Sequence, residues 1–123
     1  MLLVTGIWNP NTQRGVYDTG RVKGQITTSS ATTILSGPNE GGTRIVGDGS
    51  VIYNYSAVDT EFFVHVKATG ETLGNSTKMF GTTLPAGETL TLAPIFLKGG
   101  DTLHLEAAAN SRLNYYLNYF TEA

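Results

Sequence analysis

The fold of this chain is decided by residues 84–120, LPAGETLTLAPIFLKGGDTLHLEAAANSRLNYYLNYF. From residue 113 onward, every second side chain in this stretch is apolar or aromatic: Leu113, Tyr115, Leu117 and Tyr119. Successive side chains of a strand point to opposite faces of a sheet, so this period of two predicts a strand with one buried face. Burying four such side chains would contribute roughly 6–10 kcal/mol before chain entropy is subtracted.

The same alternation recurs along the rest of the chain between clusters of Gly, Pro and Asn. In one segment, Phe62, Val64 and Val66 share a face, and Phe63 and His65 share the other. Strands are predicted at residues 25–37, 43–46, 50–55, 60–67, 88–92, 95–97, 102–107 and 113–120. Seven or eight short strands with frequent turn signals predict an all-β fold, an antiparallel β-sandwich or jelly roll.

Two connections carry more specific predictions. Gly47-Asp48-Gly49 joins two of the predicted strands, and its Asp-Gly pair supplies the positive φ that a tight turn needs. It predicts a β-hairpin, and a longer loop is the alternative. Residues 69–80 are the least patterned part of the middle of the chain, so we expect a surface loop there with one short strand.

Residues 1–24 stand apart from the sandwich domain predicted over residues 25–123. They are either one or two edge strands folded onto the sandwich or an arm that packs Leu3, Ile7 and Trp8 against a neighbouring subunit. An exposed tryptophan is unfavourable on a monomer and common at an interface.

Composition argues against several classes of partner. Charged residues make up 15% of the chain and the net charge is −2, so there is no basic excess to attract nucleic acid or an anionic membrane. The chain contains no cysteine, which is compatible with assembly in a reducing cytoplasm. The apolar start lacks the charged and continuous apolar regions of a signal peptide, and no stretch approaches the ~20 apolar residues of a membrane span. We expect a soluble product made in the cytoplasm.

The two histidines are weak candidates for a metal site. His65 and His104 lie on separate predicted strands, without the spacing of a metal-binding motif. Each falls on the face opposite the apolar row of its strand, so we expect exposed or hydrogen-bonded surface histidines. A zinc or copper site built from both is the alternative. No cofactor is predicted.

One triplet matches a catalytic motif. Asp18-Thr19-Gly20 is the triplet of retroviral-type aspartic proteases, all-β homodimers in which two aspartates share a proton. Here the triplet follows Val16-Tyr17 and precedes Arg21, whose cation would pair with or crowd the aspartate. We expect an ordinary turn at this triplet, and the protease is a remote alternative.

The aromatic residues have two interpretations. A stacking platform for sugars is one, because a flat apolar ring with a polar edge suits such sites. The other is a place in the core or in an interface, and alternation predicts the core for Tyr115 and Tyr119. The residues concerned are Tyr53, Tyr55, Tyr115, Tyr116, Tyr119 and Phe120.

From about Thr32 to Ala123 the chain resembles a group of small virion proteins of tailed bacteriophages. The resemblance lies in turn-and-strand motifs: Thr32-Thr33-Ile34-Leu35 before a Gly/Pro loop, Asn54-Tyr55-Ser56 before the strand Glu61–Val66, Leu84-Pro85-Ala86-Gly87-Glu88-Thr89-Leu90, Leu97-Lys98-Gly99-Gly100-Asp101-Thr102-Leu103, and a final strand ending in Thr121-Glu122-Ala123. Such proteins are β-sandwiches that decorate capsids or build tail and fibre parts, commonly as trimers.

The resemblance implies a non-enzymatic structural protein of the virion. The implied role is a capsid decoration, or cement, protein that bridges capsomers as a homotrimer, with the major capsid protein or tail proteins as partners. A receptor- or glycan-binding module of a tail fibre is the alternative. As interface residues we predict Leu3, Ile7, Trp8, Tyr116 and Phe120.

Overall fold

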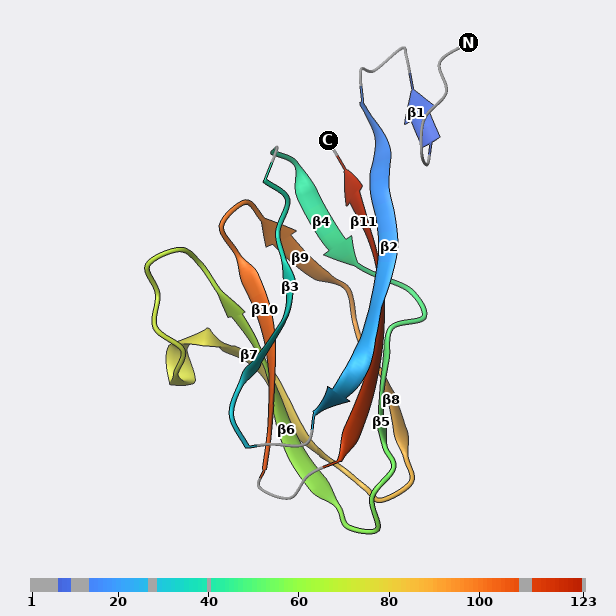
Figure 1. Ribbon diagram of the computed structural model, residues 1–123, viewed down its shortest axis with the longest axis vertical. Coiled ribbons are helices and arrows are strands. Elements are labelled where there is room, and N and C mark those ends of the chain that lie inside the picture. Colours follow the sequence, from blue (N-terminus) through green and yellow to red (C-terminus); the bar gives the residue numbers. More distant parts are fainter. Residues whose placement is uncertain (1–6, 10–13, 27–28, 40, 109–111, 123) are drawn as a thin grey trace.

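The computed structural model describes residues 7–9, 14–26, 29–39, 41–108 and 112–122. In these residues, eleven strands form two antiparallel sheets that pack face to face (Figure 1), which confirms the predicted all-β sandwich. The first six strands are β1 (Ile7–Asn9), β2 (Arg14–Ile26), β3 (Thr32–Ser36), β4 (Thr43–Val46), β5 (Val51–Asn54) and β6 (Thr60–Lys67). They are followed by the 3₁₀ turn η1 (Asn75–Thr77), β7 (Lys78–Leu84), β8 (Thr89–Thr91), β9 (Ile95–Lys98), β10 (Thr102–Ala107) and β11 (Leu113–Glu122).

The larger sheet has seven strands in the described part of the chain. Its order is β1-β2-β11-β4-β9. β11 is long enough to pair with β5 and β4 one after the other, so these two strands form one row. β8 pairs with β5 and β9 pairs with β4, so β8 and β9 form the next row, at the edge of the sheet. The smaller sheet has the order β3-β10-β6-β7. β2 and β3 therefore flank one side of the sandwich, and β7 faces β8 and β9 across the other.

The core lies between the sheets and includes most of the alternating positions that the sequence predicts. β11 contributes the fully buried Leu113 and Leu117, and β6 contributes Phe62 and Val64. The remaining buried apolar residues are Ile26, Leu35, Val46, Ile52, Leu84, Leu92, Leu97, Leu103, Leu105 and Ala107.

Two tyrosines of β11 pack over glycines of β2. Tyr115 is the cross-strand partner of Gly24, and Tyr119 is the partner of Gly20. A Cβ on Gly24 would lie 2.5 Å from the Tyr115 hydroxyl oxygen, and one on Gly20 would lie 2.7 Å from that of Tyr119. The glycines thus make room for half-buried tyrosine rings, and the predicted core position of both tyrosines is confirmed.

The predicted hairpin at Gly47-Asp48-Gly49 is wrong. β4 and β5 do not pair with each other, because both pair with β11, one after the other. Residues 47–50 lie opposite residues 117 and 118, and the Ser50 hydroxyl fills the gap in the ladder. It accepts a hydrogen bond from the backbone N–H of Asn118 at 3.0 Å and donates to the Asn118 carbonyl at 3.4 Å. The Asp-Gly pair instead occupies the middle of a turn between β4 and β5, in which the Ser50 N–H donates a hydrogen bond to the Gly47 carbonyl at 3.2 Å and Gly49 has φ 83°.

Two predicted segments differ more clearly from the observed strands. The run 25–37 is divided between the end of β2 and β3, and β2 crosses the predicted domain boundary after residue 24. Residues 78–84 form the seven-residue strand β7, where the sequence predicted a surface loop with one short strand over residues 69–80. β7 alternates poorly because it is an edge strand that contains a bulge and Gly81, so its pairing with β6 decides its conformation.

Candidate functional site: an open side of the sandwich

The edges of both sheets leave backbone groups outside the described ladders. On one side, β7 pairs with β6, β8 with β5 and β9 with β4, and no second partner strand occurs among the described residues. On the other side, β3 pairs with β10, and β1 covers β2 at residues 14–16. Exposed edges of this kind can pair with a strand of another chain.

An apolar groove opens between β7 and the β8–β9 row. Its volume is about 410 Å³, and no residue that lines it is charged. The Phe80 side chain belongs to the core face, since Phe80 pairs with Val64 and its ring packs edge-on against Phe62 with centroids 6.1 Å apart. Phe80 is nevertheless 43% exposed. The lining residues are Val64, Met79, Phe80, Leu90, Thr91, Leu92, Ala93, Pro94 and Ile95.

A β-bulge places Met79 at the groove. In the ladder of β6 and β7, Val64 pairs with Phe80 and His65 pairs with Lys78, so Met79 is the extra residue. Bulges re-aim a side chain and are frequent at sheet edges. Met79 is 59% exposed. The sequence analysis missed this groove, and its only signal was the apolar pair Met79-Phe80 in a stretch without alternation.

The apolar surface continues around β9 onto the outer face of the larger sheet. Phe96, the neighbour of the groove residue Ile95, is 61% exposed. Phe96 pairs across the strands with Ile45, which in turn pairs with Phe120. Phe120, one of the predicted interface residues, thus ends a row of apolar side chains that begins at the edge of the groove.

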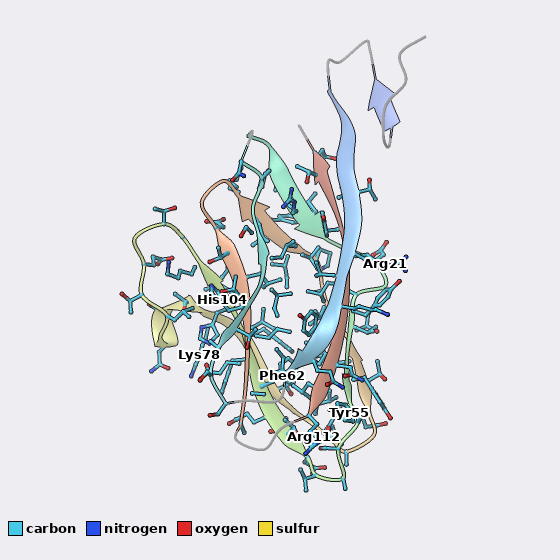
Figure 2. The ribbon with its side chains drawn as sticks, in the orientation of Figure 1. Arg21, Tyr55, Phe62, Lys78, His104 and Arg112 are labelled. Atoms are coloured by element: carbon cyan, nitrogen blue, oxygen red, sulfur yellow. The ribbon has the colours of Figure 1, made fainter. Side chains whose placement is uncertain are left out.

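Of the other predicted interface residues, the structure describes the side chain of Tyr116 alone, and it lies away from this side. Tyr116 is on the outer face of β11, where its hydroxyl accepts a hydrogen bond from Arg21 Nη1 at 2.6 Å. Figure 2 shows Arg21 on the outside of the larger sheet. Leu3 lies outside the described residues. Ile7 and Trp8 form part of β1, but their side chains are outside the described part, so their role stays a prediction.

A second depression lies on the outer face of the larger sheet. It has a volume of about 500 Å³ and is lined in part by Tyr53 and Tyr116, with Lys23, Gln25 and Asn114 beside them. The arrangement combines aromatic rings with polar side chains. It is the place in the described structure where the proposed sugar platform would lie.

The two histidines are cross-strand partners on the outer face of the smaller sheet. The predicted face is confirmed, but both are buried, with His65 2% and His104 7% exposed. His65 Nδ1 is 2.8 Å from Thr77 Oγ1, and its Nε2 is 2.7 Å from Glu106 Oε1. Thr77 lies in the turn η1, so His65 holds the loop before β7 against the sheet.

His104 is enclosed in the same way. Its Nδ1 is 3.1 Å from Thr33 Oγ1 and its Nε2 is 2.8 Å from Thr102 Oγ1. Burial lowers the pKa of His104, and the neighbouring His65 and Lys67 lower that pKa further by charge repulsion. All four ring nitrogens of the pair therefore have protein partners. Among the described residues, no group of three or more His, Cys, Asp or Glu side chains could hold a metal ion.

The Asp18-Thr19-Gly20 triplet does not form the expected turn. It lies inside β2, where Asp18 and Thr19 form a β-bulge opposite Phe120 of β11. The side chain of Asp18 is outside the described part. The protease alternative therefore depends on the sequence triplet alone.

Comparisons with known proteins show a shared fold. No protein-family model matches the chain, and no curated protein matches its sequence. Among solved structures, the chain is similar to one from the disulfide-linked pili formed by Bacillus endospore appendages, with a TM-score of 0.53, 11% identity and coverage of 97% of this chain and 96% of that one. The Yersinia pseudotuberculosis-derived mitogen gives a TM-score of 0.41 and 14% identity over 83% of this chain and 84% of the mitogen, too distant to support a conclusion. In the described part of the chain, no helix has the length and hydropathy needed to cross a bilayer.

Proposed function

We propose that this chain is a non-enzymatic structural subunit that joins copies of itself, through the open sides of its sandwich, into a fibre. The observation that carries this proposal is the groove beside β7, where Phe80 belongs to the core face and is still 43% exposed. An exposed apolar patch bordered by open strand edges is typical of a surface that another chain covers.

The two open sides of the sandwich differ, which favours an open fibre over a closed ring. β2 and β3 border one side, and β7, β8 and β9 border the other. When unlike surfaces of identical subunits meet, the contact is head-to-tail. Such contacts give a filament unless the rotation from each subunit to the next closes the assembly into a ring. The similarity in fold to a structure from a pilus also supports assembly into a fibre. Those pili are disulfide-linked, whereas this sequence contains no cysteine, so its contacts would be non-covalent.

The more specific assignment from the sequence is a trimeric decoration protein of a phage capsid, made in the host cytoplasm. It depends on the turn-and-strand motifs of residues 32–123. A decoration protein would form a closed trimer of fixed mass and bind capsids. A fibre subunit would form particles whose mass grows with concentration.

Light scattering and negative-stain electron microscopy test the proposal. We expect the mass to rise continuously above that of the 13.1 kDa chain as the concentration increases from micromolar to millimolar, with linear particles in the images. A monomer throughout this range would refute self-assembly. A fixed trimer would favour the decoration protein.

A glycan-binding module is the second candidate function, because Tyr53 and Tyr116 border one depression with polar neighbours. On a glycan array, we expect binding by the wild type and its loss in Tyr53→Ala if this candidate is correct. No bound glycan would exclude it for the sugars tested.

A further inference from the structure

We propose that the groove between β7 and the β8–β9 row receives the N-terminal segment of a second copy of this chain, residues 1–6, which precede β1, as an added extended strand. This inference rests on the proposed self-assembly and identifies the two surfaces that meet. It is supported by the chemistry of the groove, by the chemistry of the segment and by their places in the fold.

The groove has the properties of a strand acceptor. The outer edge of β7 has no partner strand in the described residues, so its backbone groups are available for a further ladder. The lining is apolar apart from Thr91 and contains no charged residue. A strand added to such an edge gains main-chain hydrogen bonds, and every second side chain points to the same face. Those side chains would cover Met79 and Phe80.

The N-terminal segment matches this lining. Residues 1–6 have the sequence MLLVTG, which begins with four large apolar side chains. The first charged side chain of the chain is that of Arg14. An apolar groove excludes charged side chains because their desolvation is unfavourable, so an uncharged apolar segment is the occupant that the lining selects.

The segment of the same copy cannot fill its own groove. β1 and β9 lie at opposite edges of the larger sheet, separated by β2, β11 and β4. This is four strand spacings, about 19 Å. Residues 1–6 span roughly 20 Å when fully extended, so nothing would be left to lie along the groove. β1 and the beginning of β2 also project past the end of the sandwich, away from its body (Figure 1). The occupant is therefore the segment of another copy.

Complementation of two defective variants tests the proposal. Met79→Glu places a charge at the groove, and the double substitution Leu3→Asp with Val4→Asp places charges in the segment. We expect each variant alone to remain a monomer. Their equimolar mixture should give a heterodimer of twice the 13.1 kDa mass, because one partner retains an intact groove and the other an intact segment. Val58→Glu is the matched control: Val58 is as exposed as Met79 but lies outside the groove, so this variant should polymerise like the wild type.

Cross-linking gives an independent readout. The chain contains no cysteine, so the pair Leu3→Cys and Met79→Cys introduces the only thiols. We expect oxidation to yield a ladder of covalent multimers on a non-reducing gel. The pair Leu3→Cys and Val58→Cys should yield no ladder.

The outcomes separate this inference from the proposed function. If the segment variant polymerises like the wild type while Met79→Glu does not, another part of the neighbouring copy fills the groove. The inference is then wrong and self-assembly stands. Normal polymerisation of both variants would also refute the inference alone. If the wild type is monomeric at every concentration, both proposals are wrong.

Discussion

Two regions of this sandwich hold side chains in unusual surroundings. The outer face of the smaller sheet buries His65 and His104, and the side opposite β2 and β3 exposes Met79 and Phe80. The polar region is complete within one subunit: all four imidazole nitrogens have partners, and no buried side-chain nitrogen or oxygen in the described part lacks one. The apolar region is open. The first region therefore serves the stability of the subunit, whereas the second is the surface that we propose another chain covers.

The largest expected effect separates the core from the groove. Phe62→Ala should lower the free energy of unfolding by about 3–5 kcal/mol, because Phe62 is fully buried and truncation leaves a cavity. Phe80→Ala removes a ring that packs against Phe62 but is already 43% exposed. We therefore expect the free energy of unfolding to fall by only about 1 kcal/mol.

Urea denaturation followed by circular dichroism measures both losses at a concentration where the chain is monomeric. In light scattering, Phe80→Ala should weaken self-assembly more than its small effect on stability would explain. Equal losses of stability in the two variants would mean that the groove is part of the subunit core and does not await a partner.

An intermediate effect is expected in the polar region. His65→Ala leaves buried Thr77 and partly buried Glu106 without their imidazole partner, and a lost partner of this kind costs about 1–3 kcal/mol. The matched control is Glu61→Ala, at an exposed position of the same strand, which should change stability by no more than about 0.5 kcal/mol. Urea denaturation measures both. If His65→Ala were as mild as its control, the histidine pair would not hold the loop before β7.

Alternation in the sequence predicted the sheets but not the way in which they are bordered. Residues 60–67 and 102–107 form β6 and β10 with the predicted bounds and faces, because strands in the middle of a sheet bury one face along their whole length. β7 lies at an edge, where one flank of the strand is open and the need for alternation is weaker. Its existence, its bulge at Met79 and the groove beside it follow from pairing with β6.

The same reasoning explains the error at Gly47-Asp48-Gly49. An Asp-Gly pair specifies positive φ locally, and a turn needs that φ both in a hairpin and between two strands that pair with a common neighbour. The choice is made by β11, which is long enough to pair with β4 and β5 in succession. Likewise, the face of the two histidines was readable from alternation. Their burial was not, because it depends on the loop that Thr77 anchors over His65.

The smallest expected effect concerns pH and separates the two regions again. The pKa of His104 is lowered from its ordinary value of 6.5 by burial and by repulsion from His65 and Lys67, while Thr33 and Thr102 supply neutral partners. Below about pH 6.5 the unfolded chain takes up a proton that the folded chain resists. The free energy of unfolding should therefore fall as the pH decreases below that value, by at most about 1.4 kcal/mol per pH unit for this one proton. The loss should stop once the pH is below the folded-state pKa.

Urea denaturation between pH 7.5 and 5.5 measures this slope. His104→Gln keeps a polar side chain beside both threonines without a titrating ring, so its slope should be flatter than that of the wild type. Stability that rises on acidification would show that the folded chain stabilises the imidazolium and would contradict the burial argument. The groove is lined by no titratable residue, and we therefore expect the contact within it to keep its affinity across the same pH range. We therefore expect the stability of the subunit to depend on pH and the contact in the groove not to. This difference follows because the buried histidines have their partners within the subunit, whereas the apolar groove is the surface proposed to bind a neighbour.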